Sequence, residues 1–135
     1  QLEDTDRLKI LNKIVDVSEV IFENKDYNFH YRLMCLVCTH IAAVAVRAKD
    51  YDEAFENLRK ALNYSIAVDE LPERKPYTSL AVNKLIYDMY DISVSSPTLC
   101  CKELLGYLNW SVYDEIRDTE MFQEIYLKAK EHCDK

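Results

Sequence analysis

The sequence predicts an all-α domain, a bundle of about six helices, and three observations support this class. Apolar residues recur at helical spacings of three and four through most of the chain. One Gly and three Pro among 135 residues leave few helix breakers. No run of residues makes a convincing strand. We therefore expect one domain over residues 1–135, at least half helical and without a sheet, with a sizeable core.

A central hairpin is the clearest element. The stretch from Leu33 to Ala48 is apolar almost all round, broken mainly by Thr39, His40 and Arg47, so we expect it to be buried on every side. A polar break at 49–52 can cap the next helix, which is expected to run to about residue 70. Its apolar stripe consists of Ala54, Leu58, Ala61, Ser65 and Val68.

The other helices follow from capping residues and apolar faces. Thr5 or Asp6 is the expected cap of the first helix, Asn28 that of the central one and Asp118 that of the last. The first helix carries two neighbouring apolar rows: Leu8, Leu11, Val15 and Phe22 beside Ile10, Ile14, Val17 and Ile21. Two more helices are expected from Thr78 or Ser79 to Tyr90 and from Ser96-Pro97 to Asn109, with a short helical turn at 110–117. Gly106 suggests a close helix crossing or a weak point.

The charge balance limits the partners of this segment. Seventeen basic and 24 acidic residues give a net charge of −7 and a pI near 5.0. An acidic surface argues against direct contact with nucleic acid or an anionic membrane. No apolar run approaches the ~20 residues of a membrane span, and no signal peptide is visible. We expect a cytoplasmic protein without a membrane partner.

The five cysteines do not predict a metal site. Cys35 and Cys38 have zinc spacing but lie in the most apolar helix, and the second pair, Cys100 and Cys101, is adjacent. Structural zinc sites need four ligands and usually two separated knuckles. The sequence therefore predicts buried, reduced thiols, no metal and no cofactor.

No catalytic constellation is found, so we expect no enzyme. Cys38 and His40 are two residues apart and therefore point to different faces of a helix. The ten tyrosines leave two interpretations open, because tyrosine suits both a binding surface and the half-buried edge of a core.

Part of the hairpin resembles a tetratricopeptide (TPR) repeat. Asp50-Tyr51-Asp52-Glu53-Ala54, followed by Lys60-Ala61-Leu62, is similar to the second half of that repeat. The resemblance implies TPR-like helical hairpins in a short right-handed superhelix, with an apolar groove lined by the central helix. Its candidate binding residues are Leu36, Thr39, Ala43, Val46, Asn83 and Tyr87. The alternative that helices of the same domain cover this groove stays open.

A longer resemblance extends over most of the chain. Leu71-Pro72, Tyr77-Thr78-Ser79-Leu80, Val82-Asn83 and Ile116-Arg117-Asp118 are similar to a helical C-terminal domain of Xre/Cro-type helix-turn-helix bacterial transcription regulators. This implies a TPR-like regulatory domain whose role is dimerisation, signal sensing or both, with a second copy of the chain and a peptide or protein effector as the expected partners. DNA would be contacted only by an N-terminal domain preceding Gln1. The alternative is a free-standing TPR-like scaffold that binds a peptide or protein.

Overall fold

The predicted all-α class is confirmed, apart from one short pair of strands. The computed structural model describes residues 3–22, 26–27, 30–71, 74–76, 81, 86–88 and 99–134. Within these ranges lie α1 (Asp4–Ile21), α2 (Tyr31–Arg47), α3 (Tyr51–Asp69), β1 (Arg74–Pro76), β2 (Ile86–Asp88), α4 (Leu99–Leu108), the 3-10 helix η4 (Ser111–Ile116) and α5 (Glu120–Cys133).

The α2–α3 hairpin is the centre of the fold. Ala42, Val46, Ala54, Leu58 and Ala61 are fully buried, and their small size at most of these positions lets the two helices approach closely. Full burial of a side chain such as Leu58 contributes about 1.5–3 kcal/mol. The helical spacing of apolar residues in the sequence therefore identifies the core residues of this hairpin correctly.

The turn of this hairpin is built from local hydrogen bonds. Lys49 has a φ of 63°, and the Asp50 N–H donates to the Ala45 carbonyl at 2.9 Å, which closes the end of α2. Asp50 then caps α3, because its carboxylate accepts the Glu53 N–H at 3.4 Å. The predicted polar cap at this break is confirmed.

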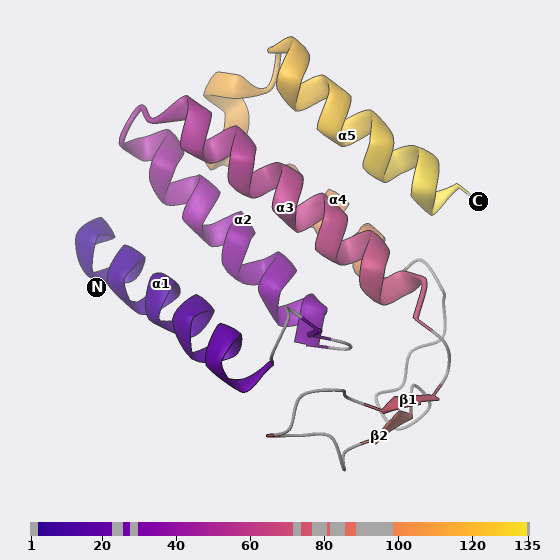
Figure 1. Ribbon diagram of the computed structural model, residues 1–135. Coiled ribbons are helices and arrows are strands. Elements are labelled where there is room, and N and C mark those ends of the chain that lie inside the picture. The colour runs from indigo at the N-terminus through magenta and orange to yellow at the C-terminus, as the bar shows by residue number, and fades with distance from the viewer. Residues whose placement is uncertain are drawn as a thin grey trace.

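Helices α2, α4 and α5 surround α3. Figure 1 shows α1, α2 and α3 side by side, α5 beside α3 on the side away from α2, and α4 behind α3. The buried residues of α2, α3, α4, η4 and α5 make one continuous core. In contrast, α1 packs mainly on α2, through a small cluster of Phe22, Tyr27 and Met34.

The expected helix at 78–90 is wrong at its C-terminal end. Residues 86–88 form β2, which pairs antiparallel with β1 so that Lys75 lies opposite Tyr87. Ile86 and Tyr87 are β-branched and aromatic, the types that favour strands. The prediction of no sheet is corrected to this extent, and the rest of that expected helix falls almost entirely outside the described residues.

Several expected helix starts also need correction. Glu3, not Thr5 or Asp6, is the N-cap of α1, so the acids of this segment lie in the first turn. Thr119, not Asp118, caps α5, because its hydroxyl accepts the Phe122 N–H at 3.3 Å. His30 precedes α2, whereas Asn28 and Ser96-Pro97 lie outside the described residues.

Gly106 does not mark a close helix crossing. Apart from its chain neighbours and the nearby backbone of α4 itself, no atom of the described residues lies within 4 Å of the position that a Cβ would take there. The crossing interpretation is therefore wrong, and the glycine is a weak point in a helix that has room for a side chain.

Candidate functional site

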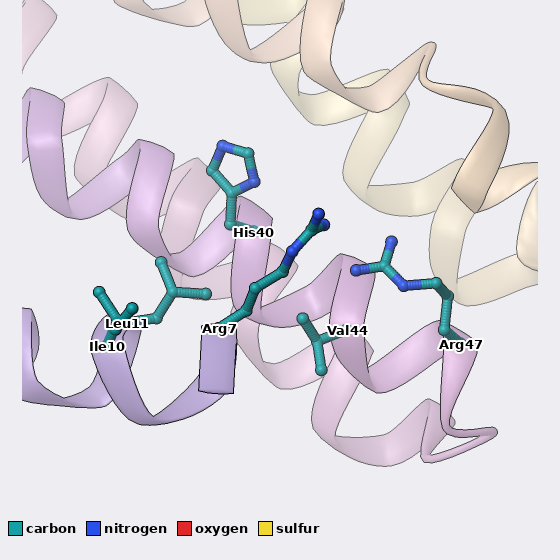
Figure 2. Close-up of a pocket in the computed structure, with 6 residues that line it drawn as sticks. All are labelled: Arg7, Ile10, Leu11, His40, Val44 and Arg47. Atoms are coloured by element: carbon teal, nitrogen blue, oxygen red, sulfur yellow. The ribbon is translucent and has the colours of Figure 1, made fainter. Parts of the chain in front are cut away.

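A pocket between α1 and α2 is the best candidate binding site in the described part of the chain. Its cavity has a volume of about 260 Å³. Each helix contributes three residues: those of α2 are spaced by four and three, and those of α1 lie within five consecutive positions. Figure 2 shows the six lining residues: Arg7, Ile10, Leu11, His40, Val44 and Arg47.

The cationic rim of this pocket contains two arginines, of which, among the described residues, one is in an ion pair and the other is not. Arg47 is fixed by Asp4, with Nε donating to one carboxylate oxygen at 2.8 Å and Nη2 to the other at 2.9 Å. This pair holds the pKa of Asp4 below its usual range. Arg7 has no ion pair among the described residues, so its guanidinium keeps its donors for a ligand.

His40 completes the polar rim. Desolvation and the positive charges of Arg7 and Arg47 lower the pKa of His40 below its usual 6.5, so the imidazole is neutral at physiological pH. Its ring lies 5.1 Å from the ring of Trp110, measured between centroids. In Figure 2 the Arg7 side chain reaches from α1 so that its guanidinium lies between His40 and Arg47.

The remaining lining residues make the pocket amphipathic. Ile10, Leu11 and Val44 are apolar, and Val44 is buried at 6% exposure. Pockets for drug-sized ligands measure ~300–1,000 Å³, so this one suits a small molecule or a single residue of a peptide. The arrangement can hold a carboxylate at its rim and a short aliphatic group on its floor.

The groove positions expected from the TPR resemblance are mostly buried inside the domain. Thr39, Ala43 and Val46 are at most 4% exposed, and the Tyr113 hydroxyl of η4 donates to the Thr39 carbonyl. Leu36 is half-buried. The alternative in which helices of the same chain cover these positions agrees with this burial.

The described lining residues of this pocket include none of the other candidates from the sequence. Asn83 lies outside the described residues, and Tyr87 is in β2. Cys35 and Cys38 are buried in α2, and burial raises the pKa of Cys38 to about 11.

Sequence reasoning missed the pocket because it spans two helices. His40 and Arg47 were visible as polar breaks in an apolar helix, seven residues apart, which is a usable signal for a shared face. Arg7 carries no such signal, because a basic residue on an exposed helix is ordinary. Pairing it with His40 requires the docking of α1 on α2.

Comparison of the chain with family models, with curated proteins and with solved structures gives no match. No helix within the described ranges combines the length and apolar character that crossing a lipid bilayer requires. A function for this chain must therefore be argued from its own residues.

Proposed function

We propose that this chain is the TPR-like regulatory domain of an Xre/Cro-type DNA-binding transcription regulator, and that it senses a peptide effector in the α1–α2 pocket. The observation that carries the proposal is the convergence of Arg7, His40 and Arg47 over an apolar floor. The sequence resemblance supports the regulator class. The ligand proposed for the pocket is a peptide C-terminus whose last residue is apolar.

The pocket chemistry supports this ligand. The unpaired Arg7 guanidinium can donate two parallel hydrogen bonds to a carboxylate, and the neutral His40 ring can donate a third. Arg47 is already paired with Asp4, so it adds positive potential without changing its partner. The last side chain of the peptide would lie on Ile10, Leu11 and Val44, and so lose water from its apolar surface.

Intrinsic fluorescence tests the proposal. Trp110 is the single tryptophan of the chain and its ring contacts His40, so a ligand at the rim changes its surroundings. An acetylated tripeptide ending in leucine with a free carboxylate should give a saturable change. The same peptide as its C-terminal amide should bind at least about tenfold more weakly, because hydrogen bonds to charged groups contribute ~1.5–3 kcal/mol.

Two arginine variants provide the control. Arg7→Gln should weaken binding of the free acid by about tenfold or more, since it removes the charge and one arm of the guanidinium. Arg59→Gln, an exposed arginine of α3 outside the pocket, should leave binding unchanged. Equal affinity for acid and amide, or equal loss in both variants, would contradict the proposal.

Self-association through α1 is the second part of the proposed function. Ile10, Val17 and Val20 are 48%, 51% and 78% exposed, so apolar surface of α1 remains uncovered in the single chain. A second copy of the chain is the proposed occupant, as in the paired regulators that the sequence resembles. Because Ile10 also lines the pocket, pairing there would place a ligand next to the dimer interface.

Sedimentation equilibrium over a concentration series measures this association. The unmodified chain should dimerise below ~100 μM, which corresponds to about −5.5 kcal/mol. Val20→Glu should abolish the dimer without unfolding the domain, because Val20 is 78% exposed. Leu127→Glu on α5, at a residue 53% exposed, is the matched control and should keep it. A strictly monomeric unmodified chain would remove the dimerisation role.

DNA contact is proposed to come from a separate helix-turn-helix domain. This segment carries a net charge of −7, and phosphate binding needs clustered Lys and Arg. A salt-sensitive gel shift by this segment alone at sub-micromolar protein would contradict the proposal that a separate domain binds the DNA. The burial of Thr39, Ala43 and Val46 weighs against the alternative of a scaffold that binds peptides in a TPR groove.

A further inference from the structure

We propose that Asp69, Cys101 and His132 form a zinc site where the ends of three helices meet. Asp69 closes α3, Cys101 lies in the first turn of α4, and His132 lies in the last turn of α5. One potential ligand atom from each residue lies within 4.8 Å of the others. Carboxylate oxygen, thiolate sulfur and imidazole nitrogen are the three ligand types that zinc takes in proteins.

The strongest single observation concerns the hydrogen bonding of the His132 ring. Its Nε2 atom is buried and has no hydrogen-bond partner among the described residues, although a buried polar atom normally has one. Nε2 lies 3.6 Å from Oδ2 of Asp69, too far for a hydrogen bond. Two ligands on one tetrahedral zinc, with bonds of about 2.0–2.2 Å, are separated by ~3.3–3.6 Å. The observed separation therefore fits a shared ion.

Asp69 is held in position by the start of α4. Its Oδ1 accepts the Cys100 N–H and its Oδ2 accepts the Cys101 N–H, both at 2.9 Å. Each carboxylate oxygen has a further lone pair, so Oδ2 can still bind a cation. Hydrogen bonds of this kind orient the ligands of metal sites, and here they connect the carboxylate to the same residue that supplies the sulfur.

Cys101 supplies a thiol that must lose its proton to bind. Its Sγ now donates to the Ala129 carbonyl at 3.1 Å. Binding of Zn²⁺ releases that proton to solvent and replaces the S–H donor with a zinc–sulfur bond. One carboxylate and one thiolate then balance the two positive charges, which a buried site requires.

Cys133 lies next to the cluster but is not one of its three ligand residues. It follows His132 in the chain, is only partly exposed, and its thiol contacts that of Cys101. One sulfur, one nitrogen and one oxygen favour zinc over Mg²⁺ or Ca²⁺, which prefer oxygen ligands, and a water molecule can fill the fourth position. A direct contact between His132 and Asp69 is the competing explanation, and it needs no metal.

Metal titration of the full chain separates these explanations. The protein is reduced, freed of metal with a chelator, and titrated with Zn²⁺ and with Co²⁺ as a spectroscopic substitute. We expect one ion per chain and a thiolate-to-cobalt charge-transfer band. Cys101→Ser and His132→Gln should each weaken binding by about 100-fold or more, since loss of an outer partner alone costs 10–100-fold. Cys38→Ser, a buried thiol of α2 outside the cluster, should keep full binding.

Thermal unfolding of the unmodified chain makes the test independent of how the variants fold. A site shared by three helices should raise the melting temperature by about 9 °C at free zinc 100 times its Kd, and chelator should reverse the rise. Absence of stoichiometric binding, or binding that survives both ligand substitutions, would overturn the proposal. The buried pair of His132 with Asp69 would then be the better explanation.

Discussion

Replacing Tyr113 with phenylalanine removes one buried hydroxyl and nothing else. Tyr113 is fully buried, and its hydroxyl donates to the Thr39 carbonyl in the middle of α2, so this bond joins η4 to the central helix. The ring of Tyr113 also lies nearly parallel to that of Trp110, with 6.4 Å between centroids. The hydroxyl therefore helps to position the tryptophan that touches His40 in the pocket.

The expected cost follows from the state of the acceptor. The Thr39 carbonyl lies inside a helix, where it also accepts a backbone N–H four residues on, so the substitution leaves no orphaned group. The loss is then the net value of one buried hydrogen bond, about 1 kcal/mol. Unfolding entropy of ~2.1 cal/mol/K per residue converts this into a fall of about 3–4 °C in melting temperature for a chain of this length.

Tyr51→Phe is the matched control, assayed by thermal and urea unfolding monitored by circular dichroism. The Tyr51 hydroxyl donates to Glu115 at 2.6 Å, but Tyr51 is 37% exposed, so water can replace the bond. We expect a change within ~0.5 kcal/mol there. Equal shifts in the two variants, or no shift in Tyr113→Phe, would refute the reasoning that burial sets the difference.

Two further predictions concern the single glycine and the dependence of stability on pH. Gly106→Ala should raise the free energy of unfolding by about 0.5–1 kcal/mol, measured in urea titrations, because the helix has room for a methyl group. A decrease in the free energy of unfolding would contradict this prediction, since it would mean that the methyl group meets a steric clash. Desolvation lowers the pKa of His30 and His40 below 6.5 in the folded chain, so the unfolded chain takes up protons first as the pH falls. The contribution of these histidines to stability should therefore be complete well above pH 6.5 and decrease as the pH falls through it, and His40→Gln should flatten the decrease between about pH 7 and pH 5.

The sequence predicted the elements whose structure depends on local pattern. The α2–α3 hairpin follows from the spacing of Ala54, Leu58 and Ala61 and from the cap at Asp50, and all four positions behave as expected. The N-cap of α5 was less predictable, because Thr119 and Asp118 are both residue types that cap helices well. Only the docked structure decides which of them begins α5.

Both candidate sites depend on helix ends and faces that meet across the fold. Arg7 and His40 lie 33 positions apart in the sequence, and nothing in the spacing of either helix predicts that they share a pocket. The sequence drew attention to the zinc spacing of Cys35 and Cys38, whereas the proposed zinc site uses Cys101. Its partners Asp69 and His132 come from the ends of two other helices, so no short motif could reveal it.

The Asp69 cap has a consequence for the order in which the domain folds. The N-terminus of α4 receives its two capping bonds from a residue 31 and 32 positions earlier, at the far end of α3. The α2–α3 hairpin needs only contacts close in sequence, and loop closure is then inexpensive in entropy. We therefore expect the hairpin to form in the folding transition state, and α4 to gain its capped first turn only after α3 is complete. Removing this cap should accelerate unfolding and leave the folding rate nearly unchanged.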